Sequence, residues 1–387
     1  MLFYQNVTFQ VIVEIIKDYE HNNNKKNIEK LLKDSLFNPP LFIKLCSEHK
    51  LMGLVYEVLN RHDIFYLLHD KWSDIFLHYS NGNQKKNEIY QSELKIIVAK
   101  FNENNIKYAT LKGAILCSEV YNIGSRFCKD IDILIDEDQL TKASVILNEL
   151  GYVQGEKWSN NIREYSKQEK LFKRLGHHVL SSFTKKFENT EIYVNVELAF
   201  DIFNNKNSSP VKKQLVRESL NSSEVNKDMI NKLNTEIMLL QLCFSIYKDS
   251  TSVHSIRHGK DIELIKYVDL YRFILKNFSQ INWEYFIFNI NILSQDGKKA
   301  VFYTFYHLEL IFGDIIPVEI MSCLRPEDIT FLNDYGLDEE KVFRWEKSFD
   351  ERIFWSDRKF QIINNIDELK KFKEYEERVK KFQNIGE

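Results

Sequence analysis

The sequence predicts an α+β protein in which a small mixed β-sheet is flanked by an N-terminal and a C-terminal helical lobe. The chain of 387 residues contains only 12 glycines and five prolines, which favours long helices joined by few turns. Its hydrophobic fraction of 44% supplies enough apolar surface for more than one core. We therefore expect a helical lobe over 1–83, a sheet-containing core over 84–205 and a helical domain over 222–387.

Charge and cysteine content argue against several classes of protein. The net charge is −3 and acidic residues are interleaved with the lysines and arginines, so we expect no long nucleic acid as a partner. The five cysteines are scattered without a C-x-x-C pair, which argues against structural zinc and disulfides. No apolar run approaches the ~20 residues that span a membrane, and the sequence predicts no signal peptide. A cytoplasmic protein without a membrane partner is expected.

Polar breaks divide the N-terminal lobe into short helical segments. His21–Lys26 predicts a loop, and Asn38-Pro39-Pro40 ends one element and begins another. Asn81-Gly82-Asn83 predicts a further break. The lobe carries no motif with evident chemistry, so we expect it to pack or to shape the substrate site.

The predicted core alternates helices and strands. A helix over 84–104 shows apolar residues at helical spacing, and Ile106–Leu111 predicts a short strand. A helix is expected over Ala114–Tyr121, and Asp130–Ile135 predicts a second strand.

A third helix is expected over 138–150, with Asp138 as its N-cap and Gly151 at its C-terminal cap. His177–Lys185 and Glu191–Phe200 then predict an antiparallel hairpin. From about Ser222 onward the pattern is helical, and the clearest predicted helices are Met229–Tyr247, Lys260–Lys276 and Lys298–Phe312. The tail from Glu340 is charged and also predicted to be helical, and its mixed-sign run at 368–382 is typical of a solvated helix face.

The most informative motif is the D-x-D of the second strand. Residues two apart in a strand point to the same side, so Asp130 and Asp132 project together while Ile131 and Ile133 face the core. Two adjacent carboxylates repel each other unless a cation lies between them, and oxygen ligands suit Mg²⁺. An isolated D-x-D also occurs by chance on surfaces; its place on an apolar strand favours a metal site with Asp130 and Asp132 as ligands.

Two short segments are candidates for binding phosphate. Lys112 and Gly113 lie between the first strand and its helix, where free backbone N–H groups and the lysine charge suit an anion. Gly124-Ser125 ranks second, because no helix fits between it and Asp130. Arg126 contacts a phosphate, holds the carboxylates in place or lies on a solvated surface; the sequence does not decide among these.

A third carboxylate is expected on a neighbouring strand, as a metal ligand or a general base. Glu197 is the best candidate because Val196 and Leu198 flank it in a half-buried strand, where a charge needs a partner. Glu191 is the alternative, nearer the turn. The pairs His177-His178 and His254/His258 lack an accompanying zinc motif, so we interpret both as structural or substrate-facing.

These residues resemble a family of uncharacterised nucleotidyltransferases within the polymerase-β-like superfamily. The resemblance rests on Leu111-Lys112-Gly113, on Arg126 followed by Asp130-Ile131-Asp132, and on Leu150-Gly151-Tyr152. It continues more weakly into the strand Val194–Phe200 and the helical pattern Lys266–Leu270. The resemblance implies that Asp130, Asp132 and Glu197 bind the metal. Lys266 and Asp269 then either line the cleft or form a helix-packing polar pair.

The expected activity is transfer of a nucleoside monophosphate from a nucleoside triphosphate to a hydroxyl or another nucleophile, releasing pyrophosphate with Mg²⁺ or Mn²⁺ as cofactor. The acceptor belongs to a small molecule, a peptide or a protein. The predicted nucleotide-binding residues are Lys112, Gly113, Ser125, Arg126 and Lys266. The alternative is a catalytically inactive module of the same fold that binds a nucleotide or a partner protein.

Overall fold

The computed structural model describes residues 5–21, 23–176, 179–202, 210–337, 342–355 and 357–363. The chain forms two compact units. The first unit comprises residues 1–87, 117–127 and 242–359, and the second unit comprises 88–116, 128–241 and 360–387. Within the described ranges, no helix combines the length and the hydrophobicity needed to cross a membrane. The predicted α+β class is confirmed.

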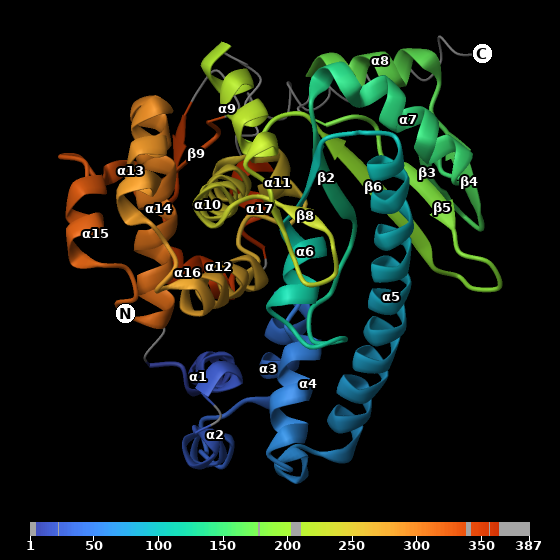
Figure 1. Cartoon of the computed structure of the whole chain (residues 1–387). Coiled ribbons are helices and arrows are strands. Elements are labelled where there is room, and N and C mark those ends of the chain that lie inside the picture. Colours follow the sequence, from blue (N-terminus) through green and yellow to red (C-terminus); the bar gives the residue numbers. More distant parts are fainter. Residues whose placement is uncertain are drawn as a thin grey trace. The chain divides into compact units, whose positions relative to one another are not determined.

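The second unit is built on a mixed sheet of eight strands, in the order β4-β3-β5-β6-β2-β1-β8-β7. Figure 1 shows β2 and β6 in the interior of this sheet. The strands are β1 (Tyr108–Leu111), β2 (Ile131–Ile135), β3 (Val153–Trp158), β4 (Asn161–Glu164), β5 (Phe183–Lys186), β6 (Tyr193–Ala199), β7 (Glu224–Val225) and β8 (Asn231–Lys232).

The order of the strands follows from their hydrophobicity. All five residues of β2 are buried, and β6 alternates buried with half-buried residues, so both occupy interior positions. β2 pairs in parallel with β6 and antiparallel with β1, and β5 and β6 form the predicted antiparallel hairpin. The sheet therefore places the D-x-D strand directly beside the strand that carries Glu197.

Helices of the second unit connect these strands. The 3₁₀ turn Glu137–Gln139 leads into α7 (Leu140–Glu149), and α8 (Lys167–Gly176) and α9 (Pro210–Asn221) follow later in the chain. The oxygen of Asp136, rather than that of the predicted Asp138, caps the first turn by accepting from the amide of Asp138 at 3.3 Å. Gly151 has φ +84, as expected for the predicted C-terminal cap of α7.

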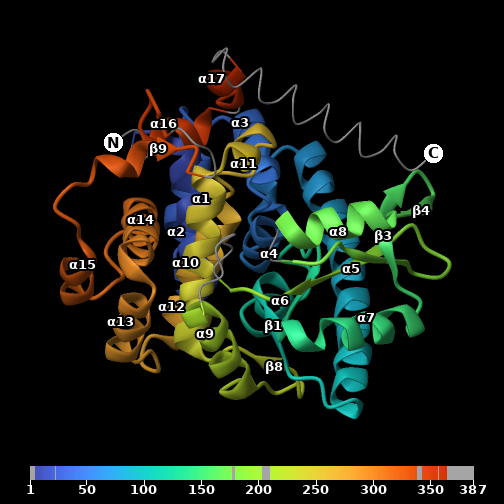
Figure 2. The ribbon, with the colours of Figure 1, turned by 90° about the horizontal axis from the view of Figure 1, so that it is seen from above.

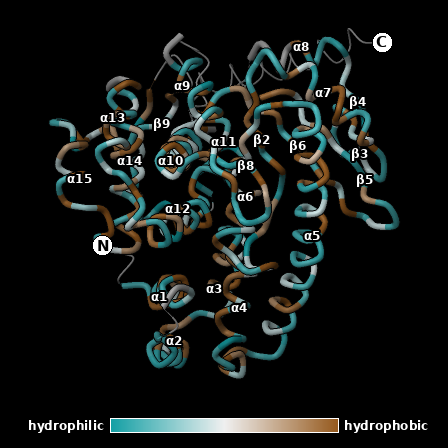
Figure 3. The backbone as a smooth tube through the Cα atoms, viewed as in Figure 1, coloured by the Kyte–Doolittle hydropathy of each residue, from teal (hydrophilic) through white to brown (hydrophobic). Residues whose placement is uncertain are grey.

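The long helix α5 (Asp70–Glu103) corrects one prediction, because Asn81-Gly82-Asn83 does not break it. Gly82 costs about 1 kcal/mol relative to alanine, and packing outweighs this intrinsic preference. Asn83 is buried and donates a 2.6 Å hydrogen bond to the carbonyl of Gly124, a contact that a sequence pattern does not reveal. Hydrophilic and hydrophobic residues alternate along α5 (Figure 3).

A second correction concerns the start of α10 (Thr235–Thr251), which was predicted at Met229. Asn231 and Lys232 instead form β8, which pairs with β1 and β7. The side chain of Asn234 then accepts a 3.0 Å hydrogen bond from the amide of Ile237 and so caps the helix. The hairpin β3–β4 was not predicted, because its exposed, polar strands lack a clear alternation of apolar and polar residues. The helix α8 was not predicted either.

The first unit is mainly helical. Figures 1 and 2 both show α13, α14 and α15 side by side. Its elements include α1 (Val7–His21), α2 (Lys25–Leu32), α3 (Pro39–Glu48), α4 (Met52–Arg61), α11 (Val253–Arg257), α12 (Leu264–Asn277), α13 (Trp283–Ile292), α14 (Ser294–Phe312), α15 (Val318–Leu324), α16 (Phe349–Phe354) and the two-stranded sheet of β9 (Asp334–Tyr335) and β10 (Phe343–Arg344). Unit boundaries lie within α5, α10, α6 (Lys112–Glu119) and α17 (Lys359–Ile363).

The loop and proline signals of the N-terminal lobe were read correctly. α1 ends at His21 and α2 begins at Lys25, within the predicted loop. Asn38 caps α3 by accepting a 3.0 Å hydrogen bond from the amide of Leu41, and Pro39 is the first helical residue. The pair His177-His178 and the mixed-sign run at 368–382 lie outside the described residues.

A buried carboxylate stabilises the N-terminal helices and predicts a pH effect. Asp18 is fully buried and accepts hydrogen bonds from the amide of Asn24 (2.6 Å), Arg61 (2.7 Å) and His62 (2.6 Å). Burial alone would raise the pKa of Asp18, but these hydrogen bonds outweigh it and lower that pKa. We expect Asp18→Asn to cost about 2–3 kcal/mol at pH 7.

The direction of the Asp18 pKa shift determines the pH range in which its stabilisation is lost. Because the folded pKa lies below the unfolded value of 3.8, the stabilisation is complete above that value and is lost as pH falls below it. Chemical denaturation from pH 7 to pH 2 should therefore show the wild type and Asp18→Asn converging at low pH. The exposed Asp74 gives a control, Asp74→Asn, with little effect. A constant gap down to pH 2 would contradict the assignment.

Candidate active site

Two carboxylates lie side by side on the adjacent strands β2 and β6, in the interior of the eight-stranded sheet. Asp132 on β2 is the register partner of Glu197 on β6. Partners in neighbouring strands project to the same face, so their side chains are lateral neighbours. Ile131, Ile133 and Val196 are fully buried on the opposite face. The third acid expected from sequence thus lies beside the D-x-D motif.

Burial and mutual repulsion perturb both carboxylates. Asp132 is 5% exposed, and its pKa is raised by burial and by Asp130, against the lowering effect of Lys112. Burial, with the charges of Asp132 and Asp130, raises the pKa of Glu197 from 4.5 to about 7. The three carboxylates therefore lie close enough to repel one another, and a cation bound among them would be stabilised.

Lys112 supplies positive charge at this site. It follows the last residue of β1, Leu111, which is the register partner of Asp132. Its ammonium nitrogen lies 3.4 Å from Oδ2 of Asp132. Lys112 has a left-handed φ of +46, a strained conformation for a non-glycine residue that turns the chain from β1 into α6. Gly113 is the next residue, in the first turn of α6.

Tyr90 fixes the segment that precedes the D-x-D motif. Its hydroxyl lies 2.7 Å from the carbonyl oxygen of Lys129 and 2.9 Å from that of Tyr193, and these two acceptors share its single proton. Lys129 is the residue before Asp130, and Tyr193 begins β6. One buried hydroxyl therefore ties the approach to β2 to the strand that carries Glu197. From the sequence, Tyr90 is only one of the apolar residues in the helix predicted over 84–104.

Asn195 is a polar residue of the site that sequence analysis missed. It precedes Glu197 by two residues in β6, so both lie on the same face. Its Oδ1 lies 2.9 Å from the hydroxyl of Thr184, which is fully buried and also lies 2.8 Å from the carbonyl of Gly155. The available signal was the N-x-E spacing, which repeats the D-x-D spacing of β2.

Ser125 and Arg126 belong to the first unit, where both are engaged. The hydroxyl of Ser125 donates to Glu57. Arg126 forms a bidentate ion pair with Asp269 of α12, at 2.7 Å and 2.6 Å. Tyr121 donates a further 2.7 Å hydrogen bond to Asp269. Arg126 is thus a half-buried partner of α12 rather than a solvated side chain, and the nucleotide-binding roles of Ser125 and Arg126 stay predictions.

Lys266 also lies in the first unit and has acidic partners there. Its ammonium is 2.9 Å from Asp249 and 3.3 Å from Glu263. Asp269, the other half of the suggested pair, instead binds Arg126. A contact of Lys266 with nucleotide therefore stays a prediction. His254 and His258 lie with ring centroids 4.4 Å apart.

The acids of the sheet have the chemistry of a divalent-cation site. As the side chains stand, no three His, Cys, Asp or Glu residues of the described chain form a ready-made metal cluster. The fit rests on the donor set: three carboxylates, two of them register partners, and a lysine drawn toward one of them. All-oxygen ligands of this kind suit Mg²⁺ and Mn²⁺. Asp130, Asp132 and Glu197 are the residues that would hold the ion.

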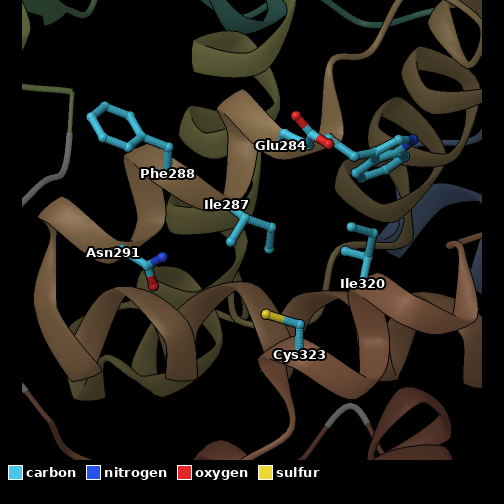
Figure 4. A pocket seen from close by; sticks show the side chains of 7 residues that line it. Glu284, Ile287, Phe288, Asn291, Ile320 and Cys323 are labelled. Carbon is cyan, nitrogen blue, oxygen red and sulfur yellow. The ribbon is translucent and has the colours of Figure 1, made fainter.

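A cavity of about 390 Å³ lies in the first unit, between α13 and α15 (Figure 4). Its lining is largely apolar and includes Ile287, Phe288 and Ile320, with Glu284 as its one carboxylate. None of the predicted site residues lines it. This cavity lacks the charge to bind phosphates, and the candidate active site remains the sheet face of the second unit.

Comparison with known families identifies the family to which the chain belongs. A family model described as "Uncharacterised nucleotidyltransferase" matches residues 35–313. The match covers most of the chain, includes all eight strands of the mixed sheet and extends into the N-terminal lobe. It confirms the resemblance inferred from the motifs. No curated protein matches the sequence.

Proposed function

Because the chain belongs to the uncharacterised nucleotidyltransferase family, we propose that it is a Mg²⁺- or Mn²⁺-dependent enzyme that transfers a nucleoside monophosphate. The donor is a nucleoside triphosphate. The acceptor is a hydroxyl or another nucleophile on a small molecule, a peptide or a protein. The observation that carries the proposal is the pairing of Asp132 with Glu197 beside Lys112.

Each site residue has a role in this proposal. Asp130, Asp132 and Glu197 hold the cation, which when bound neutralises charge on the α-phosphoryl group. Lys112, whose ammonium already lies in the site, places positive charge against the β- and γ-phosphates. The first backbone amides of α6, beginning at Gly113, donate to phosphate oxygens. Tyr90 and Thr184 hold β6 and Asn195 in position.

The transfer step is an in-line displacement. A bond forms between the acceptor atom and the α-phosphorus, and the bond from that phosphorus to the bridging oxygen of the β-phosphate breaks. Pyrophosphate leaves with the bonding electrons, and the acceptor's proton passes to solvent or to a site carboxylate. The protein contributes mainly by placing charges and orienting the phosphate chain.

Nucleotide binding should depend on the metal and on the aspartates. We expect at least one of ATP, GTP, CTP and UTP to raise the melting temperature by a few degrees with Mg²⁺ or Mn²⁺. The double variant Asp130→Ala/Asp132→Ala should lose this shift. Asp138→Asn, a variant of the mostly exposed acid that pairs with Arg217, is the matched control and should keep it.

Two outcomes would change the proposal. If no triphosphate shifts the melting temperature with either metal, nucleotide binding by the carboxylate site is wrong. If metal-dependent binding occurs but a broad panel of acceptors yields no pyrophosphate, the inactive binding module is the correct description.

A further inference from the structure

An arginine in the first unit is completely buried and has too few hydrogen-bond acceptors. Arg352 lies in α16 with none of its surface exposed. Its Nε, Nη1 and Nη2 atoms have no hydrogen-bonded acceptor in the structure. The nearby hydroxyl of Tyr303 can satisfy at most one of the five guanidinium N–H groups. Most of these donors therefore lack a partner among the residues that the structure describes.

Aromatic rings surround the guanidinium. Its central carbon lies 4.9 Å from the centroid of the Trp345 ring and 5.6 Å from that of Phe349. The indole Nε1 of Trp345 is also buried and has no hydrogen-bonded acceptor. An indole nitrogen only donates, so a second unmatched donor lies on the ring that Arg352 contacts. Around Arg352 and Trp345, the buried hydrogen-bond donors therefore outnumber the acceptors that the described residues offer them.

The charges of this region do not balance either. Among the described residues that act most strongly on Arg352, only Asp261 is a carboxylate. Asp261 already forms a bidentate pair with Arg358, through Nε at 2.7 Å and Nη2 at 2.8 Å. Two guanidinium groups thus share one carboxylate, and no second carboxylate of the described residues is among the groups that act most strongly on Arg352.

Two buried histidines experience this excess charge. Burial and then Arg352 lower the pKa of His307 to about 3. Burial and then Arg358 lower the pKa of His49 to about 4. Both rings are therefore neutral near pH 7 and add no charge. Arg352 and Arg358 each lower the pKa of one buried histidine, and Glu263 offsets part of the effect on His49.

Burial lowers the pKa of Arg352, but a guanidinium group stays protonated in proteins, so loss of a proton does not relieve the imbalance. An uncompensated buried charge is costly, and proteins pair such charges with a counter-ion. A buried water molecule could accept hydrogen bonds from the guanidinium N–H groups, but it would not neutralise their positive charge. We propose that Arg352 and the Trp345 indole bind a small monovalent anion of halide size within the first unit, independently of the carboxylate site.

Thermal unfolding at constant ionic strength tests this proposal. Replacing gluconate by bromide or chloride, from 1 to 100 mM, should raise the melting temperature of the wild type by about 2–5 °C in a saturable way. Arg352→Met keeps much of the side-chain volume, removes the charge and should abolish the dependence. Arg344→Met, which removes an exposed guanidinium paired with Asp334, is the matched control and should retain it.

Bromide also gives a direct view of the site. Crystals grown with sodium bromide should show an anomalous peak within hydrogen-bond distance of the Arg352 guanidinium. Ordered water there, with no anomalous peak and no anion-specific shift in melting temperature, would overturn the proposal. If Arg352→Met fails to fold, the bromide peak and the wild-type titration still decide the question.

Discussion

Asp132→Asn should reduce nucleotide transfer by about 10³-fold, equivalent to roughly 4 kcal/mol of lost transition-state stabilisation. Asp132 is the buried centre of the site, between Asp130 in its own strand, Glu197 on β6 and the ammonium of Lys112. Asparagine keeps the shape of the side chain but removes the negative charge needed to hold a divalent cation. Metal-dependent release of pyrophosphate from the preferred triphosphate measures the effect.

The control for this experiment is Asp138→Asn, which changes a mostly exposed acid six residues further along the chain. It should retain nearly full activity, and circular dichroism should show both variants folded. An Asp132→Asn enzyme with more than a tenth of the wild-type rate would mean that this carboxylate is not a required ligand.

Glu197→Gln should stabilise the folded protein by about 1–3 kcal/mol above pH 7 while strongly reducing transfer. Burial and the charges of Asp132 and Asp130 raise the pKa of Glu197 from 4.5 to about 7, so its ionised form destabilises the fold. Glutamine fills the same volume without that charge. The gain should be measured by chemical denaturation without divalent ions.

The pH dependence distinguishes this mechanism from ordinary packing. Below pH 4.5 the carboxyl group is protonated in both folded and unfolded chains, so the variant and the wild type should be equally stable. The gap should grow between pH 4.5 and 7 and stay constant above that. Glu191→Gln, on the exposed lead-in to the same strand, should change neither stability nor activity appreciably. A destabilised Glu197→Gln at pH 8 would contradict the expected repulsion.

The parts of the fold that sequence analysis predicted are those in which local pattern and packing agree. β2, β6 and α7 carry strong apolar periodicity, and the structure confirms each within a few residues. The prediction failed where tertiary contacts override local preference. Gly82 lies inside α5 because packing around the helix outweighs a weak local break, and Lys232 belongs to a strand because β1 offers it an edge.

In the candidate site, too, local sequence pattern predicted some features, whereas tertiary contacts decided the others. The spacing of Asp130 and Asp132 and the burial around Glu197 led to the three acids, and strand register explains why two of them are neighbours. The left-handed φ of Lys112 and the Tyr90 hydroxyl that spans two strands leave no trace in spacing. Arg126 could not be assigned from sequence because its partner, Asp269, lies more than a hundred residues further along the chain.

A crystal structure with Mn²⁺ and a non-hydrolysable α,β-methylene triphosphate analogue tests the central claim most directly. We expect an anomalous manganese peak at about 2.0–2.3 Å from carboxylate oxygens of Asp130, Asp132 and Glu197, with the α-phosphate as a further ligand and the phosphate chain near Lys112. A manganese ion bound elsewhere, or an analogue bound away from this face of the sheet, would contradict the account.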